Sequence, residues 1–198
     1  MKLSKKLYVS YKFLMIISLL SISTLSNAQI PQSDVKMMST SGIEYSVNDL
    51  IKANGTLIVF VSNDCNVVIK SQQRLIAVSD IAIRQNIGVI YINSNGQNRG
   101  DAESLEAMKR YGKSQGYNWG YLIDKNGSFA SALGATRTPE VFLYNKDGQL
   151  VFSGAIDDNP ANELGVTQQY LRTAIEQMNA GKPVSIKKSK VIGCAIKN

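Results

Sequence analysis

The chain has 198 residues, a formal net charge of +7, two cysteines and no histidine. This length allows one domain with its own apolar core. The lack of histidine excludes imidazole acid–base catalysis, Cys-His hydrolases and metal sites that depend on a histidine ligand.

The first 28 residues have the layout of a secretory signal peptide. Four lysines accompany an apolar-rich segment from Phe13 to Leu20, and Ser26-Asn27-Ala28 offers a cleavage site after Ala28. An uncleaved membrane anchor is the alternative, but serine and threonine follow Leu20 before the ~20 apolar residues that span a bilayer are reached. We therefore expect an exported protein, periplasmic or secreted, with no stable membrane insertion after cleavage.

Removing the four leader lysines lowers the formal net charge from +7 to +3. The remaining basic residues are scattered, apart from Lys187, Lys188 and Lys190 near the end of the chain. We expect no nucleic-acid partner, because such partners favour clustered basic residues.

The mature chain is expected to begin with a flexible polar lead-in over residues 29–41. A short strand over Gly42–Tyr45 follows. A brief helix over Val47–Ala53, capped by Ser46, completes this N-terminal part.

The stretch from Leu57 to about Asn86 combines a buried strand with a long helix. Leu57–Val61 is apolar, β-branched and too short for a helix, which predicts a buried strand. Turn formers occupy residues 62–64, and apolar residues then recur at helical spacing. Cys65 is therefore expected on the first turn of the helix, where free amides and the helix dipole stabilise a thiolate.

The rest of the chain alternates strands and helices. Strands are predicted over Ile87–Ile92, Tyr121–Ile123, Glu140–Tyr144 and Leu150–Ser153, the last two joined by a tight turn. Helices are predicted over residues 102–114, capped by Gly100 or Asp101, over residues 129–134 and over Val166–Met178. This pattern indicates an α/β domain over residues 42–182 and a basic tail over residues 183–198 that carries Cys194.

The Cys65 junction and four later segments carry a family resemblance. These segments are VIYINSN (Val89–Asn95), GDAESLEAMKRYG (Gly100–Gly112), GATRTPEVFLYNKDGQLVFSGAIDDNP (Gly134–Pro160) and GCAIK (Gly193–Lys197). The chain resembles the thioredoxin-like redoxins of the alkyl-hydroperoxide-reductase and thiol-specific-antioxidant type. The resemblance implies a thioredoxin-like α/β fold, with a central mixed sheet flanked by helices and an N-terminal extension.

The resemblance places a reactive cysteine at Cys65, although the usual motifs are incomplete. Thioredoxin-like oxidoreductases carry Cys-x-x-Cys, whereas Asn66-Val67-Val68 follows Cys65 here. Ser62 matches the hydroxyl position of the peroxiredoxin pattern Pro-x-x-x-Thr-x-x-Cys, but Ile58 stands in place of its proline. A buried cysteine that packs like a small apolar residue is the alternative for Cys65.

By resemblance, Pro139 is the cis-proline beside the reactive cysteine, and Thr138 presents its backbone to an extended substrate. A trans proline that opens a strand is the alternative. Arg137 would stabilise a thiolate or orient a peroxide, or else remain a solvated surface residue. Substrate binding is thus assigned to Ser62, Arg137, Thr138 and Pro139, with no metal site.

Cys194 is expected to return to Cys65 as a resolving thiol or as a permanent disulfide partner. This requires Cα atoms within ~7 Å of one another. Intermolecular pairing of Cys194 is the alternative.

Two functions remain open. The first is an exported thiol oxidoreductase that reduces peroxides or disulfides through Cys65 and Cys194, without a cofactor, with electrons from a partner thiol protein. The second is a redox-degenerate thioredoxin-like module that binds a partner without catalysis, because the second active-site cysteine is missing.

Overall fold

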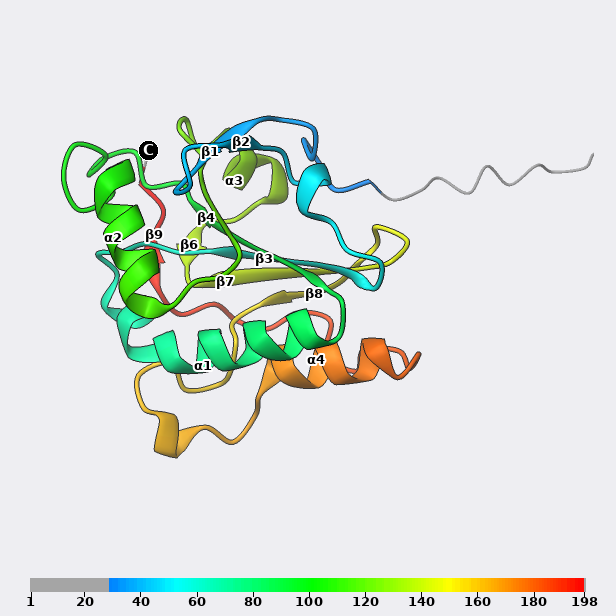
Figure 1. Ribbon diagram of the computed structural model, residues 1–198. Helices are drawn as coiled ribbons and strands as arrows, with labels where there is room; N and C mark the ends of the chain where they lie inside the picture. The colour runs from blue at the N-terminus through cyan, green and yellow to red at the C-terminus, as the bar shows by residue number, and fades with distance from the viewer. Residues whose placement is uncertain (1–28, 198) are drawn as a thin grey trace, which may run out of the picture.

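The computed structural model describes residues 29–197 (Figure 1), so the predicted signal peptide lies outside the described residues. The strands are β1 (Met37–Ser39), β2 (Glu44–Tyr45), β3 (Gly55–Phe60), β4 (Gly88–Asn93), β5 (Gly120–Ile123), β6 (Arg137–Thr138), β7 (Glu140–Asn145), β8 (Leu150–Gly154) and β9 (Cys194–Ala195). The helices are α1 (Asn66–Arg84), α2 (Leu105–Gln115), α3 (Ser128–Leu133) and α4 (Tyr170–Asn179), with 3-10 turns η1 (Asn48–Leu50) and η2 (Glu163–Gly165). Among residues 29–197, no helix is long and apolar enough to span a membrane.

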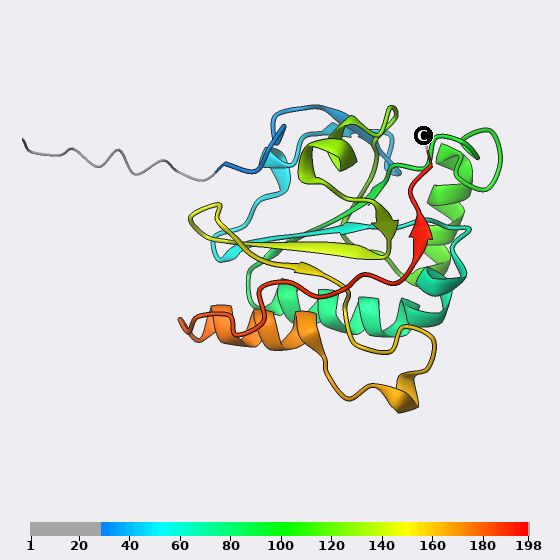
Figure 2. The same cartoon turned by 180° about the vertical axis from the view of Figure 1, so that it is seen from behind.

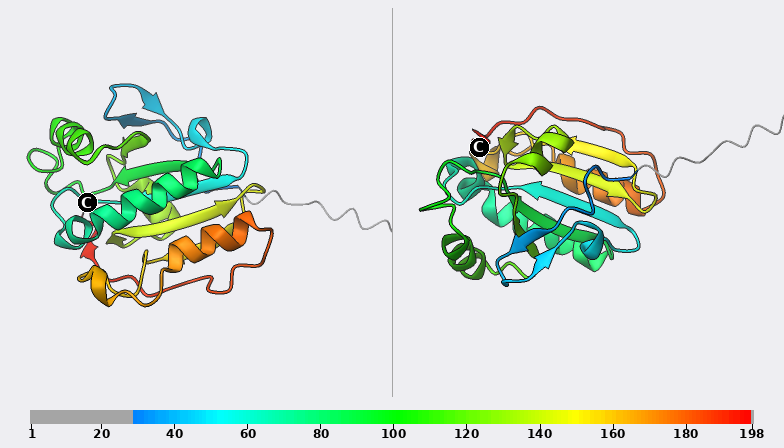
Figure 3. Two further views of the ribbon diagram at one scale, coloured as in Figure 1. Left: turned by 60° about the horizontal axis from the view of Figure 1, so that its bottom comes forward. Right: turned by 90° about the horizontal axis from the view of Figure 1, so that it is seen from above.

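Seven of the strands form one mixed sheet in the order β2-β1-β5-β4-β3-β7-β8. β3, β4 and β5 run parallel, while β7 pairs antiparallel with β3 and β1 pairs antiparallel with β5. Figures 1 and 3 show α1 and α4 side by side on one face of the sheet and α3 on the other. The predicted central mixed sheet flanked by helices is confirmed.

Strand β3 lies in the middle of the core and is buried at all six residues. Its alternate side chains point to opposite faces. Leu57 and Val59 pack in the cluster that includes Leu75 of α1, and Phe60 packs against Phe129 of α3 with ring centroids 6.3 Å apart. Because both faces are covered, the strand is a continuous apolar run rather than an alternating one.

The N-terminal lead-in, expected to be flexible, contributes strand β1 to the sheet. Met38 pairs with Ile123 of β5, and the side chains of Ile30 and Met37 are buried. The brief helix predicted after Ser46 is reduced to the single 3-10 turn η1.

Helix α2 starts later than predicted, at Leu105. Its cap is Ser104, whose hydroxyl accepts a hydrogen bond from the Ala107 amide at 3.2 Å. The prediction of Gly100 or Asp101 as the cap is therefore wrong, because residues 101–104 form a turn before the helix.

Helix α4 starts at Tyr170 instead of Val166. The Asp158 carboxylate accepts hydrogen bonds from the backbone amides of Thr167 at 3.0 Å and Gln168 at 3.1 Å. These bonds hold the segment before the helix against the preceding loop, so that it does not join the helix.

The packing of α1 leads to a stability prediction. Leu75 is completely buried, whereas the Ile69 side chain of the same helix is 50% exposed. Leu75→Ala should lower the free energy of unfolding by about 2–5 kcal/mol, and Ile69→Ala by about 1 kcal/mol or less. Urea denaturation of the oxidised proteins measures both, and equal losses would contradict this orientation of α1.

Candidate functional site

A disulfide joins Cys65 to Cys194, with Cα atoms 5.9 Å apart and a sequence separation of 129 residues. The predicted intramolecular pairing is confirmed. In the loop-entropy model, a cross-link across a loop of this length stabilises the fold by about 4–5 kcal/mol. The bond attaches β9, near the C-terminal end, to the junction between β3 and α1.

Cys65 lies at the N-terminal end of α1, as the sequence predicted. It is the N-cap residue, and its carbonyl oxygen accepts the first helical hydrogen bond, from the Ile69 amide at 2.9 Å. Its side chain is completely buried. When the disulfide is reduced, the free amides and the dipole of the helix N-terminus favour a thiolate at this position.

The loop that contains Pro139 packs directly against Cys65. The Thr138–Pro139 peptide bond is cis, as expected. The Thr138 carbonyl oxygen lies 3.2 Å from the Cys65 sulfur. In the disulfide this sulfur has no proton to donate, so the contact becomes a hydrogen bond only when Cys65 is a thiol.

A largely buried carboxylate shapes the same loop. Glu140 accepts hydrogen bonds from the backbone amides of Thr136 at 2.8 Å and Arg137 at 3.1 Å. The Arg137 guanidinium donates to the Gly193 carbonyl oxygen at 2.9 Å. In the oxidised protein, Arg137 therefore binds the C-terminal tail through its side chain.

The turn before Cys65 is held by Glu103, which is only 1% exposed. Its carboxylate accepts hydrogen bonds from the Ser62 hydroxyl and from the amides of Asn63 at 3.2 Å and Asp64 at 3.4 Å. The Asn93 side-chain amide, at the end of β4, also donates to it. The Ser62 hydroxyl is thus bonded within the protein, to Glu103.

Two further side chains extend this polar cluster. Tyr121 donates to the Asn63 side-chain carbonyl oxygen at 2.8 Å, and burial raises the pKa of Tyr121, which keeps its proton in place. Arg99 donates to the Glu103 backbone carbonyl at 3.0 Å, and burial lowers the pKa of Arg99. The cluster thereby ties β4 and β5 to the Cys65 turn.

Sequence reasoning missed Glu103, Asn93, Arg99 and Tyr121 as supports of the site. A signal was present in Asn93-Ser94-Asn95, a polar run directly after a buried strand. Polar residues that follow parallel strands meet at one edge of the sheet, which is also where Cys65 lies.

The aromatic residues around β5 pack against one another at the core and its rim. Tyr117 and Trp119 stack with ring centroids 5.1 Å apart, and both contact Tyr91. Their mutual packing identifies Tyr117, Trp119 and Tyr121 as residues of the core and its rim.

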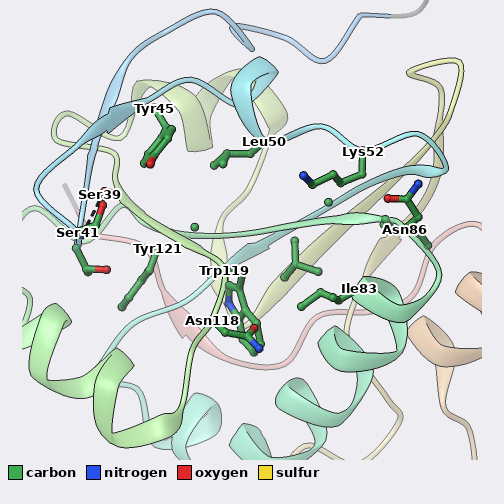
Figure 4. Close-up of a pocket in the computed structure, with 15 residues that line it drawn as sticks. Ser39, Ser41, Tyr45, Leu50, Lys52, Ile83, Asn86, Asn118, Trp119 and Tyr121 are labelled. Atoms are coloured by element: carbon green, nitrogen blue, oxygen red, sulfur yellow. Dashed lines mark hydrogen bonds between the residues drawn. The ribbon is translucent and has the colours of Figure 1, made fainter.

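A pocket of about 490 Å³ lies at the amino ends of β4 and β5, where Tyr45, Leu50, Lys52 and Trp119 surround it (Figure 4). Cys65 follows the carboxyl end of the parallel strand β3. None of the predicted site residues lines this pocket.

The acidic pair Asp157-Asp158 lies in the bend that follows β8. Asp157 makes an ion pair with Arg74, at 2.6 Å between Nε and Oδ2. Within the described part of the chain, no group of three or more acidic or cysteine side chains is arranged to hold a metal ion.

The buried carboxylate generates a prediction about the turn. Glu103→Gln replaces one acceptor oxygen by an NH₂ group that faces other donors, and should lower the free energy of unfolding by about 1–3 kcal/mol. Glu106→Gln is the matched control, because Glu106 is exposed on α2. Chemical denaturation compares them, and equal stability of the two variants would show that Glu103 does not hold the turn.

The comparisons with known proteins fit this geometry. A family model described as Redoxin matches residues 25–170. No curated protein matches the chain. A solved structure of a hypothetical protein from Sinorhizobium meliloti is 32% identical, with a TM-score of 0.77 over 86% of this chain and 93% of that chain.

Two more distant structures share the fold. A secreted disulfide oxidoreductase from Mycobacterium tuberculosis has 15% identity and a TM-score of 0.50, over 60% of this chain and 81% of its own. The bacterioferritin comigratory protein of Xanthomonas campestris has 10% identity and a TM-score of 0.56, over 76% and 93%. The fold is therefore thioredoxin-like, and because the family model covers most of its length, the chain belongs to the Redoxin family.

Proposed function

We propose that this protein is a thiol–disulfide oxidoreductase in which Cys65 attacks and Cys194 resolves. The observation that carries the proposal is the Cys65–Cys194 disulfide, seated at a helix N-terminus and against the cis-proline loop. This pairing supplies the second thiol that a Cys-x-x-Cys motif would otherwise provide, from the far end of the chain.

The reaction takes place in two exchanges. The Cys65 thiolate attacks a partner disulfide, forms a mixed disulfide with one partner sulfur and releases the other as a thiolate. The Cys194 thiolate then attacks the Cys65 sulfur, releases the second partner thiolate and restores the Cys65–Cys194 bond. A reducing partner dithiol regenerates the two thiols and is itself oxidised to a disulfide.

The site residues have different roles in this proposal. Thr138 and Pro139 position the partner, because the Thr138 carbonyl lies beside the attacking sulfur. Arg137 binds a partner's backbone carbonyl as it binds that of Gly193. Ser62 acts through Glu103 by fixing the turn before Cys65.

Reduction of a hydroperoxide is the second candidate. The Cys65 thiolate would take one peroxide oxygen and release an alcohol, and Cys194 would condense with the resulting sulfenic acid and release water. The bacterioferritin comigratory protein of Xanthomonas campestris, which shares the fold, has alkyl peroxide reduction activity. This likeness favours the peroxidase candidate. Disulfide exchange is better supported, because the Ser62 hydroxyl, which matches the hydroxyl of the peroxiredoxin pattern, donates to Glu103.

We further propose that the protein works outside the cytoplasm, as a domain over residues 42–182 to which the preceding segment adds strand β1, with the cysteine-bearing tail over 183–198. The signal-like leader, the disulfide and the secreted Mycobacterium relative support this location. We propose that its partners are thiol or disulfide proteins. In this proposal it has no nucleic-acid partner and no stable insertion in a membrane.

Cysteine variants test the reaction. Cys65→Ser should abolish thiol-dependent reduction of a model protein disulfide, whereas Cys194→Ser should accumulate a mixed disulfide at Cys65, because no resolving thiol remains. Alkylation followed by mass spectrometry identifies each species. The double variant gives the background, and full turnover by Cys65→Ser would refute the role of Cys65.

The same samples separate the other functions. A stoichiometric hydroperoxide pulse on the reduced protein should form the Cys65–Cys194 bond rapidly if the protein is a peroxidase. A partner that is captured equally well by the wild type and by Cys65→Ser, without thiol turnover, would indicate the binding module instead.

A further inference from the structure

The end of the chain lies along the backbone edge of β6, the strand that leads into the cis-proline (Figure 2). Strand β9 pairs antiparallel with β6, with Cys194 opposite Thr138 and Ala195 opposite Arg137. The Ile196 amide continues the pairing by donating to the Thr136 carbonyl at 2.9 Å. The tail therefore fills the backbone edge next to the buried sulfur of Cys65.

The tail fits this edge closely at the residue before Cys194. A Cβ atom on Gly193 would lie 2.1 Å from the Thr138 carbonyl oxygen, inside the van der Waals distance. The Gly193 carbonyl in turn receives the Arg137 guanidinium at 2.9 Å. Only glycine allows the chain to approach Thr138 this closely in this register.

The upstream part of the tail is attached separately, along β8. The Ser153 amide donates to the Lys187 carbonyl at 3.0 Å, and the Ser189 amide donates to the Ser153 carbonyl at 3.1 Å. The Ser189 hydroxyl also accepts from the Ala155 amide at 2.8 Å. β9 can therefore leave β6 while the chain up to Ser189 remains in place.

We propose that β9 occupies the binding site of a partner polypeptide on β6, where the disulfide holds it. β9 must leave β6 before a partner reacts with Cys65. The edge of β6 accepts one neighbouring strand, so the tail and a partner exclude each other. Reduction removes the covalent tether, and only the strand pairing then holds β9. This inference rests on the proposed disulfide exchange.

The geometry of β9 also specifies the chemistry of the partner. A partner cysteine that takes the place of Cys194 needs an extended backbone to pair with Thr138, and a glycine directly before it, as Gly193 is here. The partner class is thus an extended Gly-Cys segment, which includes the tail of a second copy of this chain.

A test of the gating uses the full chain with Cys194→Ser, in which Cys65 is a free thiol and the tail is still present. The probe is the peptide Ile-Gly-Cys-Ala-Ile, activated as a mixed disulfide with 2-thiopyridine. The Cys65 thiolate attacks the peptide sulfur and releases 2-thiopyridone, whose absorbance gives the rate. The non-peptide reagent 2,2′-dipyridyl disulfide reports the intrinsic reactivity of Cys65.

Adding Gly193→Val should raise the peptide rate by about tenfold or more, because the clash with Thr138 removes the hydrogen bonds that hold β9. Ala195→Val is the matched control in the same strand, since Ala195 is exposed, and should change the rate by less than about twofold. Ile196→Pro removes the donor to Thr136 and places the proline ring against the Thr136 carbonyl, and should raise the rate in the same direction. Equal rates for all these proteins would overturn the gating.

Partner chemistry is tested in the Gly193→Val protein, where β9 is displaced. The Gly-Cys peptide should react about tenfold or more faster than Ile-Val-Cys-Ala-Ile, whereas both should react alike with free glutathione. Equal rates with Cys65 would overturn the glycine requirement. If Cys65 failed to react even with 2,2′-dipyridyl disulfide, the proposed function would fail as well, whereas normal reactivity without any tail effect would overturn the gating alone.

Discussion

The bond between the Cys65 and Cys194 sulfurs is the constraint on which the arrangement of the site depends. It joins the start of α1, the longest helix among residues 29–197, to strand β9. Through it, a segment distant in sequence is placed on the cis-proline loop beside the buried sulfur of Cys65. Oxidation state and access to the site are thereby coupled in one covalent bond, so the oxidised protein keeps its own tail where a partner would bind.

The polar support of the site comes from the sheet. Parallel strands β3, β4 and β5 end at the same edge, so Tyr121 reaches Asn63 in the turn that precedes Cys65, and Asn93 reaches Glu103, which holds that turn. Glu103 completes the cluster by accepting hydrogen bonds from three consecutive residues of that turn. Because buried carboxylates are costly without donors, this cluster fixes one conformation of the turn and with it the direction of Cys65.

The sequence predicts those parts of the structure that have a local signal. Strand β3, the position of Cys65 before α1 and the β7–β8 hairpin follow from apolar runs, helical spacing and an Asp-Gly turn. The cis bond at Pro139 and the pairing of the cysteines needed the family resemblance, since neither has a distinctive local pattern. The contact of Glu103 with the Cys65 turn could not be foreseen, because its partners in the turn are 39 to 41 residues away and meet it only through the order of the strands. Strands β6 and β9 have two residues each, too few to show any periodicity.

Strand β8 lies at one edge of the seven-stranded sheet, and open sheet edges are where proteins pair with one another and aggregate. Here the tail lies along that edge, with backbone hydrogen bonds between Ser153 and both Lys187 and Ser189. The lysines of the tail add positive charge, which opposes pairing with the sheet edge of another molecule. The tail therefore covers this sheet edge in addition to its proposed part in the chemistry. A chain cut before Lys187 would present an uncovered sheet edge and an unpaired Cys65 together, and so would have both a noncovalent and a covalent route to self-association.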